Sequence, residues 1–183
     1  MSDRYPSPTH YSAPMVGLHW LSAVLVVLAI VLIESKGAFP KGDPWRDAFK
    51  MLHFQLGTMV LLVTFLRVAS LLFLPRPEPL APRGSVERRA GAAVHGMLYL
   101  FLLALPASGM LFLIATGKPI SLLGWPLPVW ADGSKQIAKP YKEIHELLGN
   151  VMIGLVALHA AAALWHQFVR RDGLLRRMWF VRG

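Results

Sequence analysis

Four long apolar segments limit what this chain can fold into more than any other feature of its sequence. They cover residues 15–33, 51–73, 90–114 and 144–169. Each holds about 19 to 26 mostly apolar residues, and an α-helix needs roughly 20 to cross the hydrocarbon core of a membrane. The chain is 55% hydrophobic, more than an ordinary soluble domain. We therefore predict an all-α membrane protein, one domain over residues 1–183 folded as a four-transmembrane-helix bundle.

The basic charge of the chain predicts how the bundle is oriented. In a soluble protein a formal net charge of +9 would favour nucleic-acid binding, but here the charges divide between the two sides of the membrane. If the helices alternate, the side with both termini carries 11 arginines against four acids, a net charge of +7. The other side carries eight basic residues against six acids, a net charge of +2. By the positive-inside rule we expect cytoplasmic termini, a lipid bilayer as the environment, and no nucleic-acid partner.

Histidine is the residue type that any metal chemistry of this chain must use. The sequence contains no cysteine, which excludes thiolate ligands, iron–sulfur clusters and covalently attached c-type haem. Six of the seven histidines lie in the predicted helices, and the alternating topology sorts them by depth. The outer layer holds only His53 and His145. The inner half holds four candidates: His19, His95, His159 and His166.

The spacing within the fourth segment indicates what these layers bind. His145 and His159 are fourteen residues apart, so they point to nearly the same face and lie about 21 Å apart along the helix. A structural zinc site needs four ligands close together, whereas histidine pairs on facing helices suit the two axial positions of haem b. A single histidine on an apolar helix more often only forms a hydrogen bond, but six in two layers favour ligation. We predict that the bundle encloses two b-type haems.

A series of short motifs, taken in order, adds a family resemblance to this interpretation. The motifs are Leu18-His19-Trp20; Met51-Leu-His53 with Gly57; Arg67 at a helix end; His95 with Tyr99 and Leu105-Pro106; and His145-Glu146 before Gly154-Leu-x-x-Leu-His159-Ala-Ala-Ala-Ala-Leu-x-His166. Together they resemble the prokaryotic cytochrome b561 family over nearly the whole chain. The similarity is closest to its small four-helix dihaem members that act as superoxide oxidases, or superoxide:ubiquinone oxidoreductases.

The resemblance implies a role for each histidine pair. It makes His19 and His159 the iron ligands of the inner haem, and His53 and His145 the iron ligands of the outer haem. Electrons would pass through the haems, so no side chain is expected to be catalytic in its own right. A bacterial inner-membrane location follows from the same resemblance.

Three further residues remain candidates for contacts beside the cofactors. His95 and His166 are candidates for a quinone site or for hydrogen bonds next to the inner haem. Arg67 is a candidate partner of a haem propionate, because its guanidinium can bind a carboxylate with two hydrogen bonds. The simpler interpretation of Arg67 is that its long side chain reaches the lipid headgroups.

The expected activity is haem-dependent oxidation of superoxide. Superoxide at the periplasmic face would give up an electron, the electron would reach ubiquinone in the bilayer, and dioxygen would be released. Lysines expected on the outer side could steer the anion; they are Lys36, Lys41, Lys118, Lys135, Lys139 and Lys142. Quinone reduction also takes up protons, and the sequence does not choose among the possible relays, which are Glu34, Asp132, Glu143, Glu146 and the histidines.

Two other functions stay open. The chain could be an electron-carrying cytochrome b subunit that links a periplasmic or membrane partner redox protein to the quinone pool. Such subunits tend to have additional helices and docking loops, which we do not find here. A haem-independent transporter with a histidine relay would predict inverted repeats and broken helices, and the sequence shows neither.

Overall fold

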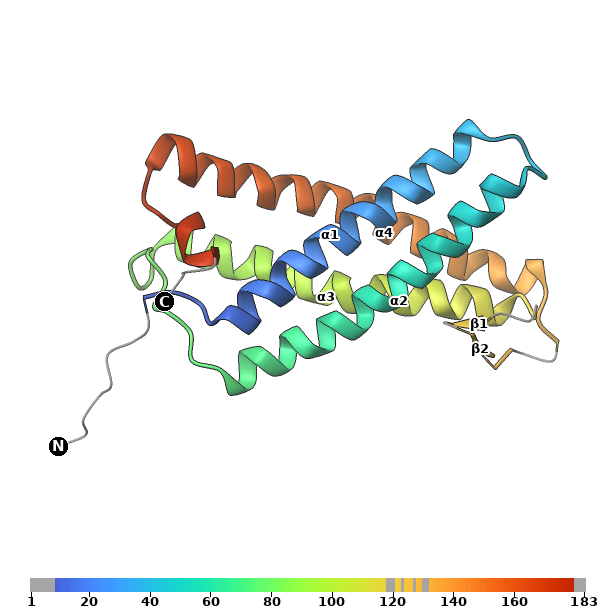
Figure 1. Cartoon of the computed structure of the whole chain (residues 1–183), viewed down its shortest axis with the longest axis horizontal. Coiled ribbons are helices and arrows are strands. Elements are labelled where there is room, and N and C mark those ends of the chain that lie inside the picture. Colours follow the sequence, from blue (N-terminus) through green and yellow to red (C-terminus); the bar gives the residue numbers. More distant parts are fainter. Residues whose placement is uncertain (1–8, 118–120, 123, 127, 130–131, 180–183) are drawn as a thin grey trace.

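The computed structural model describes residues 9–117, 121–122, 124–126, 128–129 and 132–179. Its main elements are four long helices, α1 (Ala13–Ser35), α2 (Pro44–Phe73), α3 (Val86–Ala115) and α4 (Lys135–Trp165) (Figure 1). The short elements are η1 (Lys36–Ala38), β1 (Ser121–Leu122), β2 (Trp125–Pro126), the π-helical turn η2 (His166–Arg170) and η3 (Leu175–Met178). All four long helices are long and apolar enough to cross a membrane, which confirms the predicted fold class.

The helices run beyond the apolar segments from which they were predicted. α2 begins at Pro44 and α4 at Lys135, although the apolar runs start only at residues 51 and 144. Their polar first turns are stabilised by N-caps: Asp43 Oδ1 accepts from the Trp45 N–H at 2.8 Å, and Ser134 Oγ accepts from the Ile137 N–H at 3.2 Å. Hydropathy does not detect such turns, so the two outer connections are shorter than the sequence analysis predicted.

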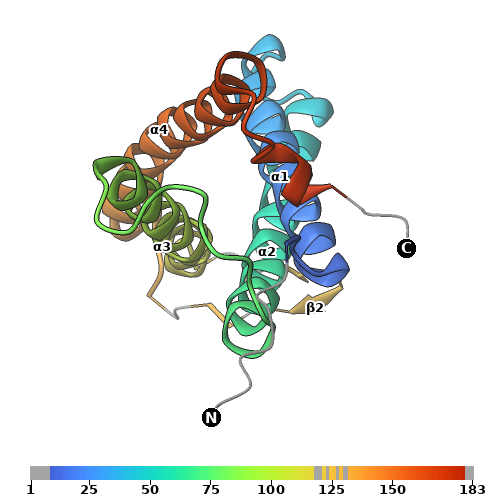
Figure 2. The same ribbon diagram turned by 90° about the vertical axis from the view of Figure 1, so that its left-hand side faces the viewer.

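Different helix ends and connections lie at the two ends of the bundle. The start of α1, the α2–α3 connection and the end of α4 lie at one end, which we refer to as the inner end (Figure 1). η1 and the β1–β2 hairpin lie at the opposite, outer end. Viewed from the inner end, α1 lies beside α2, and α3 beside α4 (Figure 2).

The apolar core fills the middle of the bundle, between the two histidine layers. It consists of Leu25, Val60, Val63, Leu102 and Met152. Each lies between the inner and outer histidine positions of the bundle. Many large apolar side chains on the outward faces of the helices are about half exposed, as expected where lipid rather than water surrounds them.

The chain after α4 folds back across the inner end. Met178 O accepts a hydrogen bond from Trp20 Nε1 at 2.8 Å, and the Trp179 ring packs edge-on against Trp20. Arg177 donates to Glu78 O at 2.6 Å in the α2–α3 connection. These contacts join the C-terminal segment to α1 and to that connection, so the segment forms part of the bundle.

Candidate functional site

His53 and His145 meet at the outer end, one from α2 and the other from α4. Their ring centroids are 6.0 Å apart and the rings are nearly perpendicular, at 80°. An ion held at the usual metal–imidazole distance of about 2 Å from one nitrogen of each ring would separate the ring centres by about 6 Å. The spacing of this pair would therefore fit one metal ion between the two imidazoles.

Backbone carbonyls fix the orientation of both outer imidazoles. His53 Nδ1 lies 2.8 Å from Ala29 O on α1, and His145 Nδ1 lies 3.0 Å from Leu105 O on α3. Because a carbonyl oxygen only accepts, each Nδ1 carries the proton and each Nε2 keeps its lone pair. Nε2 is then the nitrogen available to a metal, and the carbonyl hydrogen bond increases its basicity.

The inner end brings three histidines together. The centroid of the His159 ring is 6.2 Å from that of His19 and 5.2 Å from that of His95. The first distance matches the outer pair, and the second is a closer edge-to-face contact. His95 Nδ1 also bonds the Gly91 carbonyl of its own helix at 2.7 Å. Within the described ranges no three His, Cys, Asp or Glu side chains are grouped to hold one metal ion, so histidine pairs are the candidate ligands.

Arg67 points into the bundle at the same level. Its Nη1 donates to Ser22 Oγ at 2.7 Å, and its Nη2 lies 3.2 Å from His19 Nδ1. The guanidinium carbon lies 5.0 Å from the centroid of the Tyr99 ring, within the range of a cation–π contact. The interpretation of Arg67 as a side chain that reaches the lipid headgroups is therefore wrong, because polar and aromatic partners inside the bundle hold its charge.

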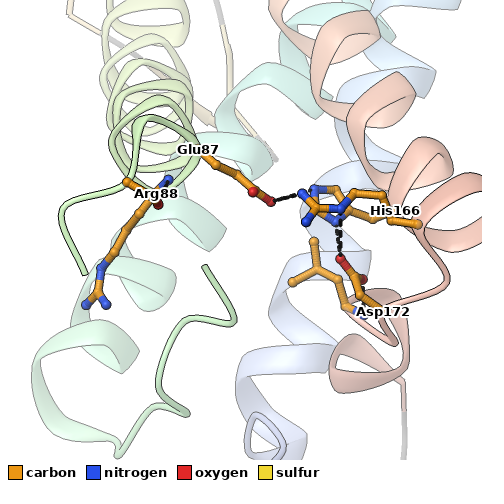
Figure 3. Close-up of polar contacts among 7 residues, drawn as sticks. Glu87, Arg88, His166 and Asp172 are labelled. Carbon is orange, nitrogen blue, oxygen red and sulfur yellow. Dashed lines mark hydrogen bonds and ion pairs between the residues drawn. The ribbon is translucent and has the colours of Figure 1, made fainter. Parts of the chain in front are cut away.

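His166 has different neighbours from the other inner histidines. Its Nδ1 lies 2.5 Å from Asp172 Oδ2, and its Nε2 lies 3.6 Å from Glu87 Oε1 at the start of α3 (Figure 3). Arg170 donates to the same Glu87 oxygen at 2.6 Å. Neither acid was predicted from the sequence to be part of a site. The Asp172-Gly173 turn signal just after the apolar run could have indicated that the chain reverses here and returns a carboxylate to the helix end.

Of the two acids beside His166, Asp172 lies outside the membrane-spanning segments and Glu87 lies inside one. Partial burial raises the pKa of its carboxyl, but other contacts outweigh that effect. The hydrogen bonds from His166 and the Leu174 N–H, with the positive charges of His166 and Arg170, hold the pKa below its usual value. Asp172 is therefore ionised at neutral pH.

The outer lysines that were predicted to steer superoxide differ in their contacts. Lys139 and Lys142 form i,i+4 ion pairs with Glu143 and Glu146, at 3.7 and 2.6 Å. Glu143 and Glu146, two of the acids predicted as possible proton relays, are therefore engaged in ion pairs. Lys118 lies outside the described residues.

Lys36 directly follows α1 at the outer end. Its charge acts on both His53 and His145. Arg46 fixes the surrounding backbone by donating to Lys36 O at 2.9 Å and to Phe39 O at 2.7 Å.

Comparison with known proteins identifies the family. The chain matches the family model of prokaryotic cytochrome b561 over residues 10–180. It belongs to the prokaryotic cytochrome b561 family. This confirms the resemblance found in the sequence, and it makes the protein a membrane electron-transfer protein of a bacterial inner membrane with b-type haem as its cofactor.

Individual relatives align over nearly their whole length. A probable superoxide oxidase, CybB, of Yersinia pestis is 35% identical over 170 residues, which is 92% of this chain and 94% of the relative. Cytochrome b561 homolog 1 of Escherichia coli K12 is 30% identical over 168 residues, or 92% and 96%. Cytochrome b562 of Cereibacter sphaeroides is 29% identical over 172 residues, or 92% and 94%.

Proposed function

We propose that this protein is a superoxide:ubiquinone oxidoreductase. Superoxide gives up an electron at the outer end, the electron reaches ubiquinone in the membrane, and dioxygen leaves. The observation that carries the proposal is a pair of facing histidines at each end of one bundle, with ring centroids 6.0 and 6.2 Å apart. Such layers suit one-electron carriers stacked across a membrane. The 35% identity with a probable superoxide oxidase favours superoxide as the donor.

Each histidine pair is proposed to hold one haem b, His53 with His145 and His19 with His159. Bound haem supplies a one-electron iron couple whose potential the protein tunes. The two sites differ in one respect. The outer imidazoles donate from Nδ1 to carbonyls, whereas His19 Nδ1 faces Arg67, which can only donate.

The contact between Arg67 and His19 has a consequence for the inner site. When Nδ1 accepts a hydrogen bond, the neutral ring carries its proton on Nε2, the nitrogen needed by an iron. To hold an iron through Nε2, His19 would have to carry its proton on Nδ1, and Arg67 would have to give up this contact. The released guanidinium is then a partner for a propionate, a role that its planar donor set suits.

Lys36 is the proposed guide for the anionic substrate. A fixed positive charge beside the outer pair raises the local concentration of an anion. The charge of Lys36 acts on both outer histidines, whereas Lys139 and Lys142 are neutralised by ion pairs. In this proposal the outer end faces the periplasm, because most arginines lie at the opposite end, beside the cytoplasm.

Ubiquinone is proposed to bind near His166 at the inner end. His166 follows His159 by seven residues, which places it about 10 Å further along the helix on nearly the same face. A quinone carbonyl there would have a hydrogen-bond donor on one side and the inner pair on the other. His95 packs against His159 and is proposed to support the inner ligand.

The proposal is tested by following haem absorption of the purified, oxidised protein during a pulse of superoxide. We expect fast haem reduction that an added superoxide dismutase abolishes. A protein that contains haem, stays oxidised under superoxide and is reduced by a chemical reductant would contradict the proposed donor. That result would favour an electron-carrying subunit fed by a partner redox protein.

A further inference from the structure

The inner end holds an imidazole placed between two carboxylates from different elements. Asp172 Oδ2 lies 2.5 Å from His166 Nδ1, and Glu87 Oε1 lies 3.6 Å from Nε2 on the opposite side of the ring (Figure 3). The side chains of His166 and Asp172 are 18% and 26% exposed. The His166 ring is therefore largely shielded, and the Asp172 carboxylate is somewhat more exposed.

The backbone after α4 is shaped to bring Asp172 back to His166. The helix ends in a π-helical turn, Arg171 adopts φ +53°, and Gly173 adopts φ +76°. A left-handed conformation at the non-glycine Arg171 is uncommon. Asp172 Oδ1 accepts from the Leu174 N–H at 3.1 Å, which leaves Oδ2 for the imidazole.

Two acids and one arginine surround His166. Arg170 forms a 2.6 Å ion pair with Glu87 and also lies 4.0 Å from Asp172 Oδ2. With His166 neutral, these two acids and one arginine carry one net negative charge, and protonation of His166 cancels it. Arg88, in the first turn of α3, faces Glu78 at 4.0 Å.

The two ring nitrogens of His166 have different tasks in this arrangement. Nδ1 is engaged by Asp172. Nε2 is 3.6 Å from Glu87 Oε1, too far for a hydrogen bond, and among the described residues no other hydrogen-bond partner is found for it. In the protonated ring, Nε2 therefore has an N–H that can be donated to a bound quinone.

A cavity borders the other side of the cluster. A cavity of about 490 Å³ borders Asp172 and is lined by Gln167, Phe168, Arg171, Asp172, Gly173 and Arg176. It opens on the inner end, next to the segment that folds back under the bundle. Water in this cavity can return a proton to the Asp172–His166 pair after each transfer.

We propose that Glu87, His166 and Asp172 form the proton-donating site for the quinone, with His166 as the donor and the two carboxylates as positioning residues. The inference rests on the proposed function and assigns the proton source that quinone reduction needs. Two superoxide ions each lose one electron and leave as dioxygen, while the quinone gains two electrons and two protons. For each proton the Nε2–H bond of the protonated ring breaks and a quinone O–H bond forms. A proton from water on the inner side then restores the Nε2–H bond.

The test uses the holoprotein reduced chemically and mixed with a short-chain ubiquinone, so that it does not depend on superoxide. Haem oxidation is followed by stopped flow from pH 5 to 9. We expect His166→Gln to slow it about 100-fold, the lower range for loss of a general acid. Asp172→Asn keeps an acceptor for Leu174 and should slow it about tenfold and change its pH profile, because the carboxylate that accepts from His166 Nδ1 is lost.

Glu78→Gln is the matched control, since Glu78 is an inner-end acid that pairs with Arg83 instead of His166. We expect it to keep the wild-type rate and pH profile. Asp172→Asn keeps the inference testable if His166→Gln does not fold. Wild-type rates and pH profiles in both variants would overturn this inference alone. A reduced wild-type protein that ubiquinone does not oxidise would overturn the proposed acceptor as well.

Discussion

Gly109 on α3 lies so close to His145 that a Cβ at this position would be 2.9 Å from His145 Cε1 and 3.1 Å from Nδ1. No side chain fits there unless the imidazole moves. At Gly96, on the same helix, a Cβ would meet no heavy atom within 4 Å. The His145 ring therefore occupies space that is open because residue 109 is a glycine.

The substitution Gly109→Ala should displace His145 and weaken the outer haem site. Overpacking of this kind costs about 1–3 kcal/mol, so we expect a loss of haem from the outer site and a lower thermal stability. Haem content per protein and Tm measure both effects. Gly96→Ala is the matched control and should keep wild-type haem content. Equal haem content in the two variants would contradict the close packing of Gly109 on His145.

Single histidine substitutions should divide the histidines into ligands and neighbours. We expect His53→Ala and His19→Ala each to remove one haem, because each breaks a different pair. His95→Ala should keep both haems, since its ring is only 5.2 Å from that of His159 and its Nδ1 bonds its own helix. The haem-to-protein ratio and a redox titration measure the outcome. Loss of a haem in His95→Ala would assign His95, in place of His19, to the inner iron.

Arg67 should raise the midpoint potential of the inner haem. A positive charge beside an iron site favours the reduced form, which carries one charge less. We expect Arg67→Gln to lower the potential by about 60 mV, equivalent to a tenfold change in a one-electron equilibrium. Arg67→Lys keeps the charge and should lower it less. The potential of the outer haem is the internal control, and an equal shift in both haems would contradict the local effect.

Docking of the C-terminal segment should depend on acid pH through Asp172. Its contacts hold the pKa of the carboxyl below the usual value. A lowered pKa adds stability that is present above the unfolded value of about 4 and is lost as the pH falls below it. We expect hydrogen exchange to show residues 174–179 protected at neutral pH and released in acid. In Asp172→Asn the protection should be weaker at neutral pH and should change little with acid.

The sequence was sufficient to predict the parts of the fold that depend on the length of the apolar segments and on the order of the histidines along the chain. It predicted four spanning helices because lipid imposes a simple length rule. It also predicted that His53 would meet His145. The helix starts at Pro44 and Lys135 were missed because capping by Asp43 and Ser134 extends a helix without adding apolar residues.

The contacts of Arg67 and His166 could not be predicted because they depend on how residues far apart in the sequence pack against each other. Arg67 can reach the headgroups or turn inward, and only the proximity of Ser22 on α1 and Tyr99 on α3 decides between them. Glu87 approaches His166 through the packing of α3 against α4. Asp172 approaches it through a local chain reversal at Arg171.

Quinol formation from superoxide is the measurement that tests the central claim most directly. The protein in lipid vesicles with ubiquinone would receive superoxide from outside, and ubiquinol, dioxygen and hydrogen peroxide would be quantified. We predict one ubiquinol for every two superoxide ions, because a quinone takes two electrons and each superoxide supplies one. Formation of ubiquinol should stop when a dismutase is added. Superoxide that decays to hydrogen peroxide while ubiquinone stays oxidised would contradict the proposed function.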